Sequence, residues 1–574
     1  MNKKILLIYT LACLLYCCIL PSQAFIKITD LVFDGMSVDP DEFDVTLELI
    51  KENKRKNKAN EAKGKVKRFP TKLTTITASQ ANPKDIQLEV DTSEVVAKTA
   101  KDIQGAISNV NFLNAISEAI SLWEGVMIAD VDFAPLKFAS GQPNSDDGRN
   151  VITFRAVEGI EGAPEGTPIF TIVTYARSKQ VEFMGKNIKV KPGTILDADI
   201  VYDPTNDPCL ALHTTEGDFK IGGGDIAIAD GGINPNADLS NCTFISAGDV
   251  TDLAVRSIAH ILGLESSAIA SAGSASVGQI MTRYSLTSDD EIGLANIYPN
   301  KATLTNHGSL NGKVTLNKKP VTGAHIVLEN TTTGEPTVGG ITDTKGKFEI
   351  NSIPAGSYNV YVEPLDGPIR KAGLGFSFLG FNANLNFTTT ILPDPITITA
   401  NKTTRIKNIE VKELSASAFN INHLTVALTE EDVNASSGAF ILPIRIMSGE
   451  TLTDIDFWGS NINPEFGTLS VSGTGITVSN VRENKSIPIS PFFTCAECED
   501  TPTSMCSRDP RCDVTEEIDE EPDELPGITV DITCTAGTPP GPRNIIFTGD
   551  VLDPENPSFG LRDQISGGII VTED

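Results

Sequence analysis

The stretch "GDVTDLAVRSIAHILGLESS" (residues 248–267) decides how the first half of this 574-residue chain is interpreted. Asp249 has a side chain that can cap the start of a helix, and Gly263 is the residue type that most often ends one. The apolar residues between them recur at helical spacing. The stretch therefore predicts a helix that carries one histidine, His260, close to its C-terminal end.

Segments on both sides of this helix extend the pattern. Before it stand "AISEAISLWEGV" (115–126), "DDGRNVITF" (146–154) and "GTILDADIVYDP" (193–204); after it come "QIMTRYS" (279–285) and "LTSDDEIGLANIYP" (286–299). In this order they resemble the matrixin branch of the metzincin metalloproteases over residues 64–300. The zinc-binding motif of that family is H-E-x-x-H-x-x-G-x-x-H, followed by a Met-turn. The resemblance implies an α+β metzincin-like domain, with Met281 in the Met-turn.

The resemblance does not extend to the family's chemistry. His260 takes the place of the second zinc ligand, but Arg256 stands at the first and Ser266 at the third, while Ser257 stands at the general base. A guanidinium about 4 Å from a divalent ion would be repelled by about 8 kcal/mol at an effective dielectric constant near 20. Arginine also stays charged at ordinary pH. We therefore expect a pseudoenzyme with no catalytic residues, in which His260 is at most a residual metal ligand.

Two alternatives to a pseudoenzyme with a binding role remain open. One is an extracellular zinc metallopeptidase with an unusual metal site, in which His213 would assist His260. The other is a purely structural spacer. For His260 itself, the plainest interpretation is a packed histidine with one hydrogen-bond partner. Zinc is expected only under the first alternative.

A glycine- and aspartate-rich segment, "KIGGGDIAIADGGINPNADLSNC" (220–242), precedes the helix. The resemblance to matrixins implies structural calcium in such a loop, with Asp225 and Asp230 as ligands, because calcium prefers oxygen donors. An ordinary surface loop is the alternative. Cys209 and Cys242 are the only cysteines of residues 64–300, and we expect a disulfide between them in an exported protein.

The second half of the chain has the short alternating runs and turn residues of β-structure. Residues 304–413, with "GKVTLNKKPVTGAHIVLEN", "TDTKGKFEI" and "IPAGSYNVYVEP", resemble the transthyretin-type β-sandwich of carboxypeptidase regulatory-like domains. Residues 415–574 resemble an immunoglobulin-like β domain with an acidic, cysteine-bearing insertion at 494–525. The C-x-x-C of that insertion is also a zinc spacing, but disulfides are the expectation outside the cell.

The N-terminus predicts export. Residues 1–24 have the basic start, apolar stretch and small-residue end of a signal peptide, and residues 25–63 form an N-terminal segment or linker. Seven cysteines remain after the signal, so at least one is unpaired within the chain. The net charge of −29 argues against nucleic acid as a partner. No later segment is long and apolar enough to predict a transmembrane helix.

The sequence as a whole predicts a secreted or cell-surface multidomain protein. Its fold class is an α+β metzincin-like domain followed by two all-β sandwich domains. We expect it to bind a protein or peptide ligand outside the cell, or to serve in adhesion. No cofactor is expected beyond structural calcium.

Overall fold

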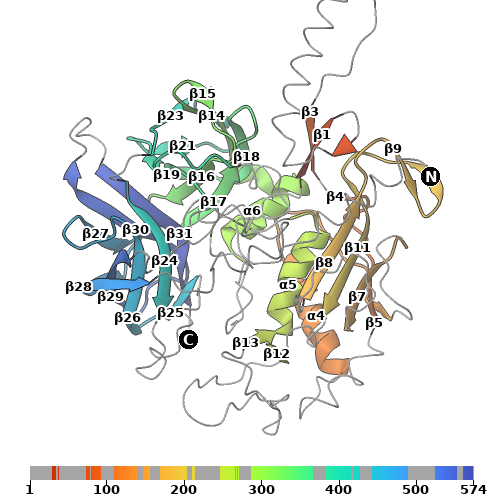
Figure 1. The fold of residues 1–574 in the computed structure, drawn as a ribbon. Coiled ribbons are helices and arrows are strands. Elements are labelled where there is room, and N and C mark those ends of the chain that lie inside the picture. Colours follow the sequence, from red (N-terminus) through yellow and green to blue (C-terminus); the bar gives the residue numbers. More distant parts are fainter. Residues whose placement is uncertain are drawn as a thin grey trace, which may run out of the picture.

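The computed structural model describes most of the second half of the chain and parts of the first. The described residues are 29–33, 36–37, 73–77, 79–91, 109–138, 147–154, 169–202, 210–213, 246–264, 267, 269, 286–365, 383–414, 418–426, 443–488, 524–552 and 560–572. Strands predominate in them (Figure 1). Among these residues, no helix is both long and apolar enough to cross a membrane.

A mixed sheet organises the described part of residues 79–300. Its parallel strands lie in the order β4 (Ser79–Gln80), β11 (Thr194–Tyr202), β7 (Asn150–Phe154), β5 (Leu88–Asp91) and β6 (Lys137–Phe138). Strand β8 (Ile169–Tyr175) pairs antiparallel with β11. The predicted strands "NVITF" and "ILDADIVY" therefore lie next to each other in one sheet.

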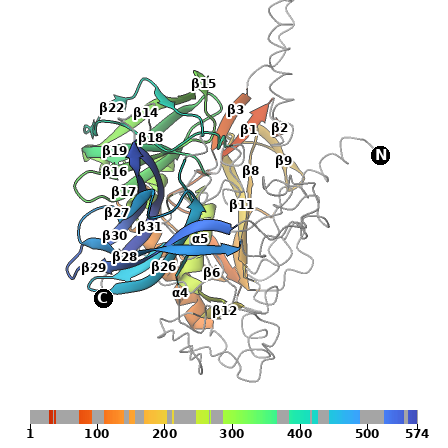
Figure 2. The same ribbon diagram turned by 60° about the vertical axis from the view of Figure 1, so that its left-hand side comes forward.

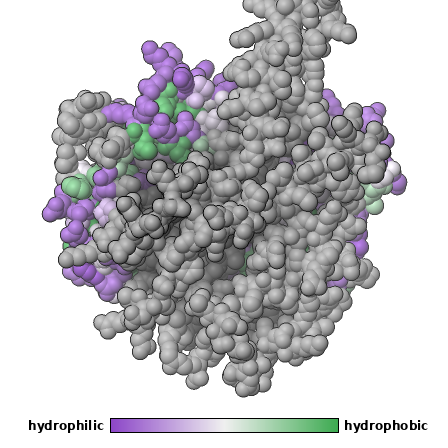
Figure 3. All heavy atoms as spheres, in the orientation of Figure 1, coloured by the Kyte–Doolittle hydropathy of each residue, from purple (hydrophilic) through white to green (hydrophobic). Residues whose placement is uncertain are grey.

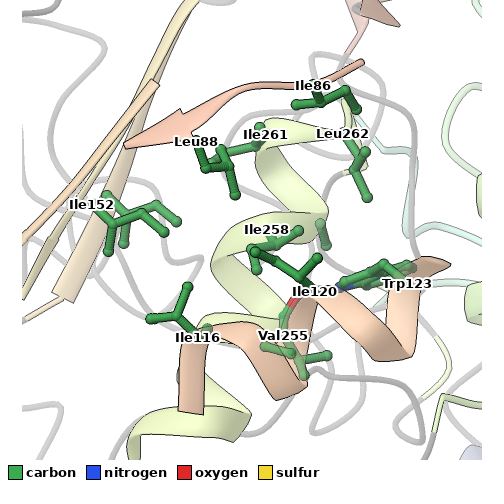
Figure 4. Close-up of a cluster of buried hydrophobic side chains, with 14 of the residues drawn as sticks. Ile86, Leu88, Ile116, Ile120, Trp123, Ile152, Val255, Ile258, Ile261 and Leu262 are labelled. Carbon is green, nitrogen blue, oxygen red and sulfur yellow. Dashed lines mark hydrogen bonds between the residues drawn. The ribbon is translucent and has the colours of Figure 1, made fainter. Parts of the chain in front are cut away.

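Helices α4 (Asn109–Glu124) and α5 (Val250–Ile261) pack together and cover this sheet with apolar side chains. Figure 4 shows side chains of both helices converging with Leu88 and Ile152 of the strands. The indole of Trp123, which is fully buried, donates a hydrogen bond of 2.8 Å to the carbonyl of Val255. This bond satisfies the indole N–H and ties α4 to the middle of α5.

Three small sheets accompany the mixed sheet. They contain β1 (Thr29–Phe33), β2 (Met36–Ser37) and β3 (Leu73–Thr77); β9 (Gln180–Phe183) and β10 (Lys186–Lys189); and β12 (Leu210–His213) and β13 (Ser246–Asp249). Strand β1 pairs antiparallel with β3, so residues 25–63, expected as an N-terminal segment or linker, contribute a strand to a sheet with residues beyond them. Strands β12 and β13 are parallel.

Residues 307–411 form two facing sheets. One contains β14 (His307–Leu316), β15 (Lys319–Pro320), β18 (Lys347–Pro354), β22 (Thr403–Arg405) and β23 (Ile409–Val411). The other contains β16 (His325–Asn330), β17 (Pro336–Ile341), β19 (Gly356–Glu363), β20 (Thr390–Ile391) and β21 (Ile396–Ile398). Apolar side chains from both sheets share one buried core, as in a β-sandwich.

The C-terminal region has two four-stranded sheets. Strands β24 (Asn420–Val426), β26 (Thr451–Ser460), β29 (Glu524–Cys534) and β28 (Ile476–Pro488) form one. Strands β25 (Ile444–Met447), β31 (Gly560–Thr572), β30 (Gly541–Leu552) and β27 (Gly467–Val471) form the other. Their buried apolar residues again form a common cluster. Figure 2 shows these strands directly below the preceding sandwich.

Strand β16 joins the two β regions because it buries side chains on both of its faces. Ile326 and Leu328 belong to the core of residues 307–411, whereas Val327 belongs to the C-terminal cluster. Successive side chains of a strand point to opposite faces. The polar residues His325 and Glu329 therefore also face the C-terminal sheets, and both are buried.

The buried carboxylate of Glu329 has hydrogen-bond donors from both sides of this junction. The Glu329 carboxylate accepts hydrogen bonds from Asn359 at 3.0 Å, Tyr361 at 2.9 Å and Asn544 at 2.6 Å. Its last partner lies on β30, 215 positions further along the chain. A buried carboxylate with several donors avoids the large cost of an unpaired charge. We call the two β regions, joined in this way, the β tandem.

A short helix joins residues 79–300 to the β tandem. Helix α6 (Ser288–Ile297) begins with a capping box between Thr287 and Asp290. Its Ile292 is 1% exposed and belongs to the core of residues 307–411 rather than to that of the mixed sheet. The carboxylate of Asp289 accepts a hydrogen bond of 2.8 Å from the backbone of Gly339 on β17. Contacts therefore cross the domain boundary that we expected near residue 300.

The backbones of Gly334 and Gly473 approach each other closely at the junction of the two halves of the β tandem. The loop at 331–335 lies against the loop at 472–475, and Ser472 Oγ donates a hydrogen bond of 2.5 Å to the Gly334 carbonyl. A Cβ on Gly473 would collide with the carbonyl oxygen of Thr333, and one on Gly334 would collide with the Gly473 backbone. Both glycines have positive φ, +73° and +82°. Only glycine fits such a backbone approach without strain.

We predict that Ile292→Ala destabilises the β tandem although Ile292 precedes it in the sequence. Removing this buried side chain should lower the free energy of unfolding by about 2–5 kcal/mol, as for other large-to-small core changes. Hydrogen exchange should show lost protection of the β17 and β18 amides. Half-buried Ile297, on the same helix, provides the control: Ile297→Ala should cost less. Unchanged exchange in β17 and β18 after Ile292→Ala would contradict the shared core.

We predict that Gly473→Ala separates the two halves of the β tandem, because the new methyl group meets the Thr333 carbonyl. Gly537→Ala is a matched control: Gly537 has a nearly identical φ of +81°, but nothing lies within 4 Å of its Cβ position. Both changes carry the same backbone strain, so the difference in melting temperature between the variants reports the docking contact. Equal melting temperatures would show that this contact contributes nothing.

Candidate functional site

Helix α5 ends in a Schellman motif, which positions the histidine predicted from the sequence. Gly263 has φ of +85°. Its N–H donates to the His260 carbonyl and that of Leu264 donates to the Ala259 carbonyl, both at 2.9 Å. The chain therefore turns sharply after the helix. This turn brings the carbonyl of Leu264 to the imidazole of His260.

His260 is a neutral histidine in one defined tautomer. Its Nδ1 lies 2.9 Å from the carbonyl oxygen of Leu264, and a carbonyl only accepts, so Nδ1 carries the proton and Nε2 has the lone pair. Burial and then the nearby charge of Arg256 lower the pKa of His260 to about 4. The side chain is therefore a hydrogen-bonded, packed histidine, as the plainest interpretation of the sequence expects.

The less buried face of α5 is a stripe of three side chains spaced four residues apart. Asp252, Arg256 and His260 are half-buried, whereas Ser257 of the same helix is buried, with 4% of its surface exposed. Residues at i and i+4 lie on one helix face. Positions 256 and 260 therefore face the same way, and the hydroxyl of Ser257 is packed into the interior.

Several residues predicted from the sequence lie outside the described residues. These are Ser266, Met281, Asp225, Asp230, Cys209 and Cys242. Within the part of the chain that is described, no group of three His, Cys, Asp or Glu side chains is placed to hold a metal ion. Strands β12 and β13, which follow the two cysteines in the sequence, pair with each other.

The backbone of His213 lies beside the start of α5, whereas His260 lies close to the end of that helix. The register of β12 and β13 puts His213 opposite Asp249, which directly precedes α5. His260 lies eleven residues further along the chain, about 16 Å at the rise of an α-helix. The backbone positions of the two histidines therefore lie near opposite ends of α5, which the sequence spacing alone did not show.

The other face of the mixed sheet holds carboxylates that our sequence interpretation missed. Asp197 and Asp199 of β11 are both buried, and Asp199 accepts a hydrogen bond of 2.9 Å from the Val151 backbone. Burial, followed by the charge of Asp197, raises the pKa of Asp199 to about 8. Arg149, which directly precedes β7, pairs with Glu89 of the neighbouring strand β5. The sequence does contain a signal for this pair, the D-x-D of "ILDADIVY". Alternate residues of a strand share a face, so this spacing puts two like charges on one face of β11.

Cys534 is a buried thiol, 1% exposed, at the end of β29. The register of the β28–β29 hairpin pairs Pro488 with Glu524 beside the insertion, and Ile476 with Cys534 at the opposite end. The other four cysteines of the C-terminal region lie outside the described residues. Cys534 is therefore a natural candidate for the unpaired cysteine that an odd number requires.

Comparison with known proteins identifies the central module. Residues 309–412 match the family model of the carboxypeptidase regulatory-like domain. This confirms the prediction made from the sequence for that β-sandwich, and the match does not reach residues 64–300. No curated protein matches the chain.

Solved structures give only weak likenesses. The minor pilin of Streptococcus agalactiae is 16% identical over 19% of this chain and 46% of its own, with a TM-score of 0.13. The major pilin of Bacillus cereus is 10% identical over 46% and 69%, also at 0.13. The 5-hydroxyisourate hydrolase of Klebsiella pneumoniae is 18% identical over 19% and 89%, again at 0.13. This chain thus spans less than half of the first pilin. TM-scores near 0.13 are too low to assign a fold or a role to this chain.

We predict that Asp199 makes the protein less stable as pH rises. Its pKa is about 8 in the folded state and near 3.8 in the unfolded chain, so the folded state binds the extra proton between these values. Stability should therefore fall from pH 4 to 8, and Asp199→Asn should flatten this part of the profile. Melting temperatures across that range test the prediction. Exposed Asp394→Asn is the control; equal slopes in the two variants would contradict it.

Proposed function

We propose that this chain is an exported binding protein whose first domain has a matrixin-like fold without a catalytic zinc site. The second domain is the carboxypeptidase regulatory-like sandwich, and the third, 415–574, is an immunoglobulin-like module. The ligand is a protein or peptide outside the cell. The two sandwiches act as the support that carries the first domain.

The order of elements supports the fold assignment. Helix α4, strands β7 and β11, helix α5 and helix α6 follow one another along the chain as the resemblance requires. The turn that follows helix α5 has Gly263 at the position of the family's glycine. These observations concern the order and the local geometry of the elements.

The stripe on α5 is the observation that carries the functional proposal. Arg256 stands one helical turn before His260 on the same face, where a second zinc-binding histidine would have to be. A divalent ion bound by His260 would therefore meet a guanidinium, with a repulsion of about 8 kcal/mol at 4 Å and an effective dielectric constant near 20. Buried Ser257 is neither long nor basic enough to replace a glutamate that activates water.

A peptide can bind to such a domain without a metal. In the described residues β8 pairs only with β11, so β8 is an edge strand of the mixed sheet. Edge strands offer backbone N–H and C=O groups to which an extended peptide can add as a further strand. Half-buried side chains such as Val173 and Thr174 would then contribute to specificity.

The β tandem supports a second role, as a rigid spacer. Its halves share the buried carboxylate contacts of Glu329 and the glycine contact at Gly473. Helix α6 adds a third connection through Asp289. A unit with such contacts would hold the first domain at a defined position relative to the C-terminus.

We predict that the wild-type protein retains no stoichiometric zinc after dialysis. If the fold is matrixin-like, combining Arg256→His, Ser257→Glu and Ser266→His restores three ligands and a base, so the triple variant should bind about one zinc per chain. Elemental analysis of both proteins provides the comparison. The same triple variant with His260→Ala is the control and should bind less.

Two outcomes would overturn parts of the proposal separately. One zinc per wild-type chain that is lost on His260→Ala would favour the metallopeptidase alternative. A folded triple variant that binds no zinc would instead reject the matrixin-like assignment of α5. Circular dichroism of each variant establishes that it is folded.

A further inference from the structure

A hairpin separates the two neighbouring strands β8 and β11 of the mixed sheet. Strands β9 and β10 form a two-stranded sheet of their own, in which Val181 pairs with Ile188 and Phe183 with Lys186. Met184 and Gly185 make the turn with φ of +51° and +69°, as in the tight turns of two-residue hairpins. Figure 1 shows this hairpin at the margin of the molecule, beyond the edge of the sheet.

The hairpin is basic in a strongly acidic protein. Residues 177–191 contain Arg177 and four lysines, with Glu182 as their single acidic residue, whereas the whole chain has a net charge of −29. The lysines are Lys179, Lys186, Lys189 and Lys191, and all four are exposed. No ion pair joins any of them to another described residue. Figure 3 shows hydrophilic residues at this margin.

An apolar contact point accompanies these charges. Met184 at the tip is 58% exposed. Val181, Phe183 and Ile188 are half-buried and lie on one face of the hairpin, because residues paired directly across two strands share a face. An exposed thioether is an adaptable surface for a partner's apolar side chain. The hairpin thus combines the exposed positive charge of four lysines with one apolar anchor.

We propose that the β9–β10 hairpin is a docking surface for an acidic polypeptide segment that also carries aromatic or apolar side chains. Opposite charges steer such a segment to the lysines. The acidity of the remaining chain does not prevent this, because exposed charges are screened beyond about 8 Å at physiological ionic strength. This surface is independent of the α5 stripe and so goes beyond the function proposed above.

The apolar part favours a polypeptide over the two other polyanions. A sulfated polysaccharide would use the lysines but offers nothing to Met184. An anionic bilayer would need a larger apolar insertion than a single methionine, since stable membrane attachment takes more than one weak signal. A peptide with both acidic and aromatic residues uses the charges and the anchor together.

The test measures binding of the full chain to a random copolymer of glutamate and tyrosine, to poly-L-glutamate, to heparin and to phosphatidylglycerol vesicles. The copolymer should bind most tightly. Lys186→Glu combined with Lys189→Glu should weaken it about tenfold, because the binding loses two exposed charge contacts. Lys402→Glu with Lys407→Glu makes the same charge change on exposed residues of the second domain and should alter binding less than about twofold.

A second variant isolates the apolar anchor. Met184→Ser should remove the preference for the copolymer over poly-L-glutamate and leave poly-L-glutamate binding unchanged. Absence of copolymer binding by the wild type would overturn the proposal, as would equal loss in the control pair. Tighter binding to heparin or to vesicles would assign the hairpin to a polysaccharide or to a membrane instead. Because Arg256 and His260 are intact throughout, none of these results tests the α5 proposal.

Discussion

Strands β16 and β19 bury side chains on both faces, and the arrangement of the whole second half depends on this constraint. A strand with one buried face can leave its other face in water. Here the second face carries Val327 and Tyr361 into the C-terminal cluster. It also carries carboxylates that need donors from the neighbouring sheet, such as the amide of Gln564, which donates to Glu363 at 2.8 Å.

These buried carboxylates make the docking specific. Glu363 also accepts hydrogen bonds from His325 at 2.7 Å and Ser566 at 3.0 Å. Removing one donor would leave a charge partly unsatisfied in an apolar interior, which costs more than the hydrogen bond contributes. An alternative packing of the sheets would have to supply equivalent donors. The polar layer therefore selects one relative position of the two sandwiches, and the close glycine approach at Gly473 supports the same position.

The end of helix α5 is defined by hydrogen bonds within the protein. Its C-terminal carbonyls are satisfied by tertiary partners: Gln80 donates to Ile261 and Tyr298 to Leu262, both at 2.8 Å. Together with the turn at Gly263, these bonds define the helix end and orient His260. None of these partners depends on a metal. If α5 is the matrixin-like helix of the proposal, it would keep its position with Arg256 in place of a ligand.

Local patterns in the sequence determined individual elements. The glycine after "HIL" predicted the end of α5, and alternating apolar residues with turn signals predicted the carboxypeptidase regulatory-like sandwich, because backbone conformation and face periodicity are properties of a few neighbouring residues. Only the tertiary structure decided that Ile292 enters the sandwich core and that Asn544 satisfies Glu329. It also decided that Asp199 is deeply enough buried for its pKa to rise. Periodicity tells which residues share a face, but the partner of that face comes from a distant part of the chain, and burial depends on that partner.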